Sequence, residues 1–351
     1  MGKDNVLVLG GGIAGLTSAL ELAESGSQVF LIEKEAEVGG YAGNYCCKAQ
    51  ENCQKCGACF VAQAIDDVNN HPNISVFCGL KIDSFQSTDG GFKVNFVNDR
   101  GEKSGFDANA VVVATGFKPF DATERQEYGY KVYDGIYTAL DLDERVREKG
   151  SFMKAFPNSV EKIAFIQCVG SRSDYPQQDY CCRVGCMYAV RMASMIREEL
   201  PEAAIDIYYM DLQNFGKGFM DYKNDCITDK NINFILGRPA KTYFHPVSKK
   251  VILKHESPAE GEPNEYEYDM VFLSIGSQPG EDTDSIAEIF NLELNEDNFF
   301  KNADTLNPGL TSQKGIFVAG SCTGPRDIAA SMQQAKAVSL NVIDYLKKQA
   351  G

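Results

Sequence analysis

The fold is decided by the stretch VLVLGGGIAGLTSALELAESGSQVFLIE, residues 6–33. Residues 6–9 form a short apolar run that is typical of a buried strand. Apolar residues then recur at helical spacing as far as about Ser25, and residues 28–33 form a second strand-like run. A strand, a helix and a second strand in this order predict a Rossmann-like βαβ unit.

Glycines in the first turn of this unit have the spacing of a dinucleotide-binding loop. Gly10, Gly12 and Gly15 match GxGxxG, and Glu33 follows at the end of the second strand. Gly10 allows the tight turn, Gly12 lets the backbone approach a pyrophosphate, and Gly15 lets helix and strand pack closely. Glu33 can accept a hydrogen bond from a ribose hydroxyl. The complete pattern predicts a dinucleotide site in the first domain.

Three later segments resemble flavoproteins that have two dinucleotide-binding domains. They are the glycine pair Gly39-Gly40, AVVVATGFKP (110–119) and GIFVAGSCTGP (315–325). The resemblance implies FAD as the cofactor, although such proteins usually have Asp where this chain has Ser321. A final helix expected over about 327–348 would offer its N–H groups and positive dipole to the reduced flavin. The FAD-binding residues that we predict are Gly10, Gly12, Ile13, Ala14, Gly15, Glu33, Lys34, Gly40, Ile82, Ala114, Thr115, Gly116, Gly320, Ser321 and Ile328.

A second βαβ unit is expected from the strands at 162–167 and 205–211, and DMVFLSIGSQP (269–279) repeats the ATG-type strand. No second GxGxxG lies between the first two strands, so we expect no productive NAD(P)H site there. The predicted fold class is α/β, with two Rossmann-like domains of the flavoprotein reductase type and only one phosphate-binding loop. We assign residues 1–120 and 280–351 to the FAD-binding domain, with a cysteine-rich insert at 44–65, and residues 121–279 to the second domain.

Nine of the twelve cysteines fall into two dense groups. The group that replaces the second glycine loop has the spacing C-x12-C-C-x3-C, formed by Cys168, Cys181, Cys182 and Cys186. We expect the last three at the start of a helix, where a spacing of four puts Cys182 and Cys186 on one face. Four thiolates suit a [4Fe–4S] cluster, which is useful beside a flavin, but zinc and other thiol roles remain open.

Longer motifs resemble the A subunit of heterodisulfide reductase and its relatives. They are IQCVGSRSDYPQQDYCCRVGCMYAVRMA (166–193), YYMDLQNFGKGF (208–219) and GIFVAGSCTGPRDI (315–328). The resemblance implies FAD, a [4Fe–4S] cluster held by this second cysteine group, and electron transfer to iron–sulfur partner subunits of the B and C type. The chain looks like the short form found in bacterial sulfur-oxidising complexes, without the ferredoxin-like inserts of methanogen versions. It departs from the family by having Cys182 and Gly185 where the family usually has Ser and Cys.

The first cysteine group spans 44–65. Cys53, Cys56 and Cys59 are spaced like the first three ligands of a ferredoxin run, and Cys46 or Cys47 would supply a fourth thiol. The trailing Cys-Pro of ferredoxins is missing. We therefore expect a second cluster here, with a zinc site built from the same residues as the alternative.

Composition limits the partners and the location. The chain has 351 residues and a net charge of −15, which argues against nucleic acid or an anionic membrane surface as the main partner. No apolar run approaches the roughly eighteen residues of a membrane span, and the glycine-rich N-terminal segment does not fit a signal peptide. We expect a cytoplasmic homodimer that acts as a flavin and iron–sulfur electron-transfer protein within a larger complex. The alternatives are a stand-alone NAD(P)H-dependent disulfide oxidoreductase and a zinc-stabilised flavin-binding scaffold.

Overall fold

The computed structural model describes residues 4–49, 52–174, 178–257 and 261–350. Residues 50–51 of the first cysteine-rich stretch and residues 175–177 of the motif at 166–193 therefore lie outside the described residues. The chain divides into two compact units. Unit 1 comprises Met1–Asn44, Gly57–Lys118 and Gln278–Gly351, and unit 2 comprises Tyr45–Cys56 and Pro119–Ser277. Part of the stretch that we expected to belong to the first domain thus folds with unit 2.

Unit 1 is built on a five-stranded sheet of parallel strands, in the order β18-β7-β1-β2-β3. These strands are β1 (Asn5–Leu9), β2 (Gln28–Ile32), β3 (Ile74–Phe77), β7 (Ala110–Val113) and β18 (Ile316–Val318). The order reverses between β1 and β7, so these two strands flank the topological switch point, where open α/β sheets bind their ligands.

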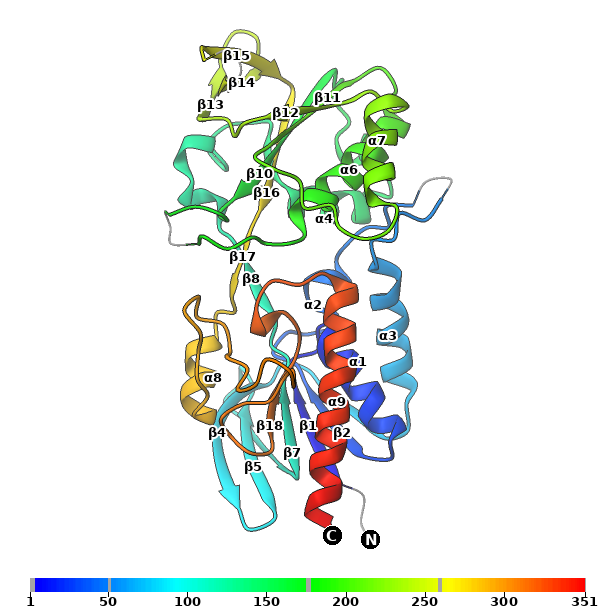
Figure 1. The fold of residues 1–351 in the computed structure, drawn as a ribbon, viewed down its shortest axis with the longest axis vertical. Coiled ribbons are helices and arrows are strands. Elements are labelled where there is room, and N and C mark those ends of the chain that lie inside the picture. The colour runs from blue at the N-terminus through cyan, green and yellow to red at the C-terminus, as the bar shows by residue number, and fades with distance from the viewer. Residues whose placement is uncertain (1–3, 50–51, 175–177, 258–260, 351) are drawn as a thin grey trace. The chain divides into compact units, whose positions relative to one another are not determined.

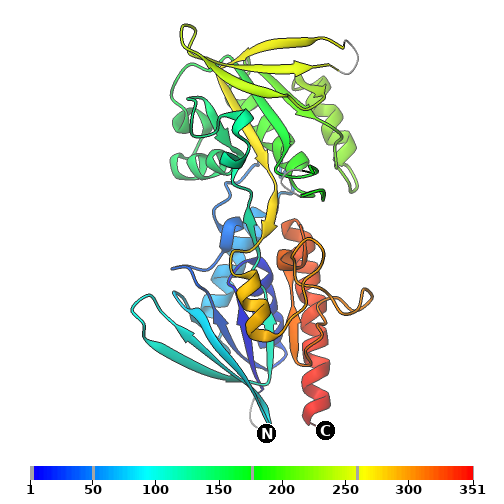
Figure 2. The ribbon, with the colours of Figure 1, turned by 90° about the vertical axis from the view of Figure 1, so that its left-hand side faces the viewer.

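Each face of this sheet packs against a separate hydrophobic core. The apolar side chains of β1 point alternately into one core and into the other. Val6 and Val8 face the core shared with α1 (Ile13–Glu24), α3 (Ala58–Asn70) and α9 (Ile328–Ala350). Figure 1 shows α1 and α9 side by side on this face. Leu7 and Leu9 face the core shared with α8 and the antiparallel sheet β4-β5-β6, which Figure 2 shows in cyan on the side opposite α9. These elements are α8 (Thr283–Phe290), β4 (Lys81–Thr88), β5 (Gly91–Val97) and β6 (Lys103–Ala108), and a short helix, α2 (Gly40–Gly43), follows β2.

Unit 2 repeats the same plan. Its five parallel strands have the order β12-β11-β10-β16-β9, so the switch point lies between β10 and β16. An antiparallel sheet, β13-β14-β15, again leads into the strand beside the switch point. The strands are β9 (Ile136–Thr138), β10 (Lys162–Val169), β11 (Ala204–Tyr209), β12 (Ile232–Leu236), β13 (Lys241–His245), β14 (Lys250–Glu256), β15 (Pro263–Tyr268) and β16 (Met270–Ile275).

The helices of unit 2 cover the core that contains Phe165 and Phe272. They are α4 (Ala139–Lys149), α5 (Phe152–Ala155), α6 (Gly185–Glu199) and α7 (Phe219–Thr228). Two short strands, β8 (Phe117–Pro119) and β17 (Ser277–Pro279), pair with each other where the chain passes between the units. The prediction of two Rossmann-like domains is therefore confirmed. Among the described residues, no helix is both long enough and apolar enough to cross a membrane.

Candidate functional site

Close backbone contacts explain the first and third glycines of the loop in unit 1. Gly10 has φ +105°, and a Cβ built on it would lie 2.5 Å from the carbonyl oxygen of Ala114 at the end of β7. A Cβ on Gly15 would lie 1.8 Å from the carbonyl oxygen of Gly10. Both distances are far below any van der Waals contact, so only glycine allows α1, β1 and β7 to meet this closely.

Gly12 differs from these glycines because it faces open space. No atom of the described residues lies within 4 Å of a Cβ built on Gly12. Gly12 is the N-cap of α1, and no side chain caps this helix end. Its neighbour is Gly40, whose Cβ would lie 3.2 Å from the Gly12 Cα. The start of α1, which no side chain among the described residues caps, and its positive dipole can therefore receive a phosphate group.

Glu33 holds the glycine loop through hydrogen bonds to the backbone. Its carboxylate is buried, with 7% of the residue exposed. Glu33 Oε2 accepts from the Gly11 N–H at 2.6 Å, and Oε1 accepts from the Glu35 N–H at 2.9 Å. Lys34 forms an ion pair with Asp282, at 2.6 Å between Nζ and Oδ2. These partners of Glu33 and Lys34 could not be read from the motif.

The ATG turn and the last glycine turn meet at the same edge of the sheet. A Cβ on Gly116 would lie 3.9 Å from Ser321 Oγ, and a Cβ on Gly320 would lie 2.4 Å from the Cβ of Ala14. The structure thus brings together predicted site residues from β7, α1 and the turn after β18. The buried Thr115 hydroxyl has no partner among the described residues, which leaves it available to a ligand.

Two of the remaining predicted residues lie in different surroundings. Ile82 is on β4, where it pairs with Phe96 and packs against the core on the other face of the sheet. Ile328 is the first residue of α9 and lies beside Gly57. Asp327 Oδ1 accepts from the Ala330 N–H at 2.7 Å, so a carboxylate already caps the helix end that we expected to face the flavin.

In unit 2 the corresponding switch point carries cysteines. Cys168 lies near the carboxyl end of β10 and has φ +58°, a left-handed conformation that is uncommon for a residue other than glycine. The register between β10 and β16 shifts between Ile166 and Val169, so Cys168 lies at a bulge. Such a bulge changes the direction of a side chain, and it occurs often beside functional sites.

The other thiols come from the loop before α6 and from its first turn. The prediction that Cys181 and Cys182 are helical is wrong, because α6 begins at Gly185 and only Cys186 belongs to it. Arg183 has φ +62°, which is incompatible with a continuous right-handed helix. Cys182 and Cys186 therefore do not share a helix face.

The four thiols differ in burial and in hydrogen bonding, and therefore in pKa. Cys168, Cys182 and Cys186 are buried and Cys181 is half-buried. Burial raises the pKa of Cys168 to about 11 and also raises the pKa of Cys186. The hydrogen bond from the Cys182 thiol lowers the pKa of Cys181 to about 6, and the Arg183 N–H, 3.3 Å from Cys181 Sγ, acts in the same direction. The surroundings thus favour the thiolate form at Cys181 and the neutral thiol at Cys168 and Cys186.

These thiols do not form a preassembled coordination shell. Within residues 4–49, 52–174, 178–257 and 261–350, no three His, Cys, Asp or Glu side chains are arranged to hold a metal ion. The candidate metal site is therefore identified by the kind of side chain, four cysteine thiols, and by their location at the switch point of unit 2. A cavity of about 270 Å³ adjoins it, lined by Cys181, Arg183, Gln213 and Phe215.

The first cysteine group is divided between the two units. Cys46, Cys47, Cys53 and Cys56 belong to unit 2, whereas Cys59 lies on α3 of unit 1. Cys46 packs into the core of unit 2, and its N–H donates to Asp143 Oδ1 at 2.8 Å. Cys47, Cys53 and Cys59 are exposed and Cys56 is half-buried.

A buried ion pair anchors this segment to unit 2. Lys48 Nζ lies 2.9 Å from Asp143 Oδ1, and the two side chains are 2% and 0% exposed. Farther along, Arg191 of α6 donates to the carbonyl oxygens of Gln54 and Lys55 at 2.8 and 3.3 Å. Lys48 is therefore tied to α4, and residues 54–55 are tied to the helix whose first turn carries Cys186.

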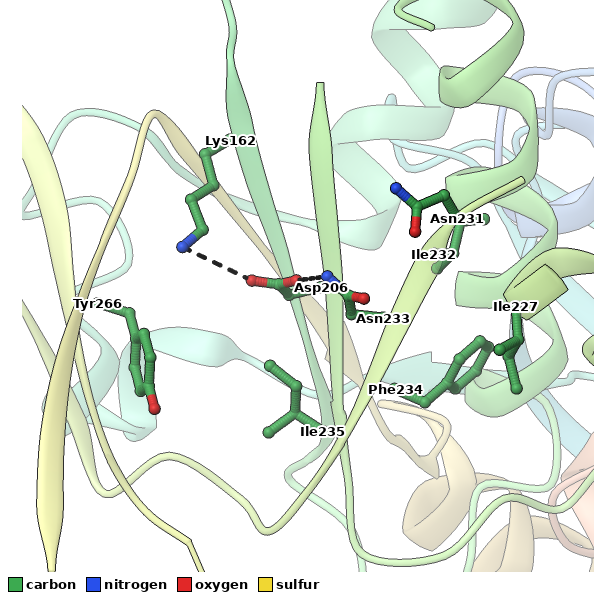
Figure 3. A pocket seen from close by; sticks show the side chains of 9 residues that line it. All are labelled: Lys162, Asp206, Ile227, Asn231, Ile232, Asn233, Phe234, Ile235 and Tyr266. Atoms are coloured by element: carbon green, nitrogen blue, oxygen red, sulfur yellow. Dashed lines mark hydrogen bonds and ion pairs between the residues drawn. The ribbon is translucent and has the colours of Figure 1, made fainter. Parts of the chain in front are cut away.

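A second cavity in unit 2 has a volume of about 590 Å³, and none of the residues that line it is a cysteine (Figure 3). Asp206 lies at its centre, where its carboxylate accepts from Asn233 at 2.8 Å and from Tyr268 at 2.6 Å. Lys162, the first residue of β10, points toward this carboxylate. The cavity thus adjoins the amino end of β10, whereas ligands of open α/β sheets bind at the carboxyl ends. We assign it no role.

The chain matches one protein family over most of its length. The sequence profile of the pyridine nucleotide-disulphide oxidoreductases matches residues 4–150 and 184–336. An iron–sulfur A subunit of the CoB–CoM heterodisulfide reductase of Methanopyrus kandleri is 31% identical over 417 residues, with 96% of this chain and 63% of that protein covered. The A subunit of the H2:CoB–CoM heterodisulfide,ferredoxin reductase of Methanothermobacter marburgensis is 28% identical, with 95% and 62% covered. The chain thus spans about three fifths of the length of these relatives.

Solved structures show the same fold at lower identity. The thioredoxin reductase of T. acidophilum superimposes with a TM-score of 0.65 at 20% identity, and 99% of each chain is covered. The NAD-dependent persulfide reductase of A. fulgidus gives a TM-score of 0.58 at 19% identity, with 96% of this chain and 58% of that chain covered. These similarities establish the two-domain fold of flavoprotein disulfide reductases.

Proposed function

The chain belongs to the pyridine nucleotide-disulphide oxidoreductase family and is a flavoprotein oxidoreductase homologous to heterodisulfide reductase A subunits; from this we propose an electron-transfer role. It is the FAD and iron–sulfur subunit of a heterodisulfide-reductase-like complex. It relays electrons between its flavin, its [4Fe–4S] centres and iron–sulfur partner subunits of the B and C type in thiol–disulfide or sulfur metabolism. The relatives' names, which describe subunits of such complexes, support this assignment.

FAD is assigned to the switch point of unit 1. The open space at Gly12 and the uncapped start of α1 suit its pyrophosphate. Thr115, whose buried hydroxyl has no partner in the described part of the chain, and Ser321 are assigned to the flavin end. Glu33 holds the glycine loop through its hydrogen bond from the Gly11 N–H. When bound, FAD supplies the exchange between two-electron and one-electron chemistry.

A [4Fe–4S] cluster is assigned to Cys168, Cys181, Cys182 and Cys186. A single observation carries this assignment: at the switch point where unit 1 has glycines, unit 2 has thiols and a strained Cys168. The cysteine sulfurs are the donors that such a cluster requires, and the start of α6 favours its negative charge. The chain's own part is to supply these thiolates and to keep three of their positions away from water.

The first cysteine group is assigned to a second cluster, with zinc as the alternative. Cys47 is exposed, whereas Cys46 is packed against Asp143, so we assign the fourth thiol to Cys47. We also propose that the chain forms a homodimer. All twelve cysteines are free, which suits a reducing compartment, and we place the protein in the cytoplasm.

Anaerobic analysis of iron, acid-labile sulfide, zinc and flavin tests the proposal. We expect the protein to contain flavin, and also iron and acid-labile sulfide in equal molar amounts to each other. Cys186→Ala should remove about four iron atoms per chain and leave FAD bound. The matched control is Cys226→Ala, which removes a buried thiol of α7 outside both cysteine groups. Zinc in place of iron, or unchanged iron in Cys186→Ala, contradicts the assignment.

Mixing with NADH or NADPH separates this role from that of a stand-alone disulfide oxidoreductase. Because the switch point of unit 2 has cysteines instead of a glycine loop, we expect slow bleaching of the flavin at most. Rapid, saturable reduction would favour the stand-alone enzyme.

A further inference from the structure

Several buried polar side chains at the switch point of unit 2 have no hydrogen-bond partner among the described residues, and Gln167 and Ser274 are the ones that lie on the two strands themselves. Gln167 precedes Cys168 on β10, and Ser274 lies on the adjacent strand β16. Each is 2% exposed. Neither the amide nitrogen nor the amide oxygen of Gln167 has a partner in the described part of the chain, and the Ser274 hydroxyl has none there either.

Such groups are rare inside proteins. Most buried polar atoms are paired with protein or ordered water, because a buried donor without an acceptor loses the hydrogen bonds it made in water. A primary amide presents two donors and one acceptor. The side chains of Gln167 and Ser274 therefore indicate that an acceptor belongs at this position.

The geometry around Gly185 shows what these side chains surround. A Cβ built on Gly185 would lie 3.2 Å from Cys182 Sγ, 3.5 Å from Gln167 Oε1 and 3.8 Å from the Ser274 Cβ. One point beside the first residue of α6 is thus bordered by the proposed ligand thiol of Cys182, by the amide oxygen of Gln167 and by the Cβ of Ser274, and the polar groups of the last two side chains have no partner among the described residues.

The start of α6 adds to the positive potential at this point. The helix has 15 residues, its N-cap Val184 offers no side-chain acceptor, and its first turn contains no acidic residue. Helix ends of this kind favour anions. Thiolates and the sulfides of an iron–sulfur cluster are anionic acceptors, whereas an apolar ligand would leave the donors unpaired.

We propose that Gln167 and Ser274 donate hydrogen bonds to the sulfur atoms of the group held by Cys168, Cys181, Cys182 and Cys186, and thereby raise its reduction potential. This inference rests on the proposed function. One-electron reduction adds a negative charge to the cluster. Donors directed at sulfur stabilise the reduced state more than the oxidised one, because the reduced state carries more charge.

The test is a redox titration of the anaerobic holoprotein, followed by the EPR signal of the reduced cluster. Ser274→Ala and Gln167→Leu each remove a donor while approximately keeping the volume, so we expect a more negative midpoint potential in both. Ser274→Thr keeps the hydroxyl and should titrate like the wild type. Iron and flavin contents are measured in parallel and should be unchanged.

The matched control is Ser194→Ala, which removes a buried hydroxyl from a later turn of the same helix. Its potential should equal that of the wild type. Unchanged potentials in Ser274→Ala and Gln167→Leu, with iron retained, overturn the inference and leave the cluster assignment intact. An unchanged potential in Ser274→Ala together with iron loss from Gln167→Leu also overturns it. A wild-type protein without iron overturns the proposed function itself.

Discussion

Asn109 and Asp269 occupy equivalent places at the amino ends of the two parallel sheets, directly before β7 and β16. Asn109 Oδ1 accepts from the Asn5 N–H at 2.8 Å, and Asp269 Oδ2 accepts from the Lys162 N–H at 2.8 Å. Each contact ties the first residue of the central strand to its neighbour. The carboxyl ends of the central strands differ in sequence: β1 is followed by a glycine loop, whereas β10 carries Cys168 and is followed by three further cysteines.

The comparison shows that different residues determine the topology of the sheets and the group that binds at their carboxyl ends. Apolar strands that are buried on both faces, together with a short polar clamp, produce the same topology in both units. The residues that follow the strands decide which group can approach the switch point. A glycine loop lets the backbone approach a pyrophosphate closely, whereas a loop that carries cysteine thiols can bind metal ions.

The largest effect is expected from blocking the open position in unit 1. Gly12→Val places a branched side chain in space that no atom of the described residues occupies, so the chain should fold but exclude the pyrophosphate. The backbone at Gly12 has φ −71° and ψ 178°, which valine adopts readily. The purified variant should therefore contain essentially no flavin, measured from its absorbance after denaturation.

The control for this substitution is Gly43→Ala, because a Cβ there also meets no atom within 4 Å in the part of the chain that the structure describes. It should keep a full complement of flavin. A yellow Gly12→Val protein with stoichiometric flavin would show that the two switch points do not differ in the way described above.

The second prediction concerns the thiol contributed by Cys182. A side chain at Gly185 would lie beside Cys182 Sγ, so a sulfur at position 185 should reach the same place. Cys182→Ser alone should lose most of the cluster iron. Cys182→Ser combined with Gly185→Cys should regain it, because four thiols again surround the point.

Iron and sulfide per chain measure this exchange in both proteins. The single variant Gly185→Cys, in which a fifth sulfur crowds Cys182, serves as the reference for packing damage. If the double variant contains as little iron as Cys182→Ser, a thiol at position 185 cannot replace the one at position 182. Cluster binding then requires the fourth thiol at position 182 and not merely four thiols.

Sequence patterns predicted the parts of these sites that depend on local spacing. The GxGxxG spacing identified Gly10 and Gly15, whose close contacts the structure confirms. It did not reveal that Arg183 adopts a left-handed conformation, which places Cys182 outside α6. Nothing in a local pattern gives the sign of φ at an arginine.

Residues that depend on tertiary contacts escaped prediction for the same reason. Gln167 and Ser274 are polar residues near the ends of otherwise apolar strands, and that contrast is the signal that could have identified them. The placement of Tyr45–Cys56 in unit 2 depends on Lys48 and Asp143, which are far apart in sequence and pair only in the folded protein.

The third prediction tests whether the segment Tyr45–Cys56, which carries four of the five cysteines of the first group, folds with unit 2. Lys48→Met leaves the Asp143 carboxylate buried without its partner, which destabilises a protein by about 3–5 kcal/mol. We expect a lower urea midpoint for unit 2 and faster proteolysis within Tyr45–Cys56. Replacing both partners, Lys48→Met with Asp143→Leu, should recover part of the loss because no charge then stays buried.

The control is the same substitution in an exposed pair of unit 1. Lys103 and Asp83 are 2.8 Å apart, but Lys103 is 67% exposed, so Lys103→Met should change stability by about 0–1 kcal/mol. Equal effects of Lys48→Met and Lys103→Met would mean that the segment is not anchored to unit 2 by this pair.

The smallest effect is expected at the amino ends, where the two units are alike. Partial burial by itself would raise the pKa of Asp269, but the N–H groups of Glu161 and Lys162 and the Lys250 ammonium outweigh it and hold the pKa below its usual value. A carboxyl with a depressed pKa in the folded state stabilises the fold above its unfolded pKa, and this stabilisation is lost as the pH falls through the folded pKa.

Asp269→Asn makes unit 2 resemble unit 1 at this position and should cost about 1 kcal/mol or less near pH 7, since the site is partly solvated. Urea unfolding of both proteins at a series of pH values should show the difference shrinking below about pH 4. A difference that stays constant down to low pH would mean that the charge of Asp269 contributes nothing, and that an uncharged clamp like Asn109 serves both sheets equally well.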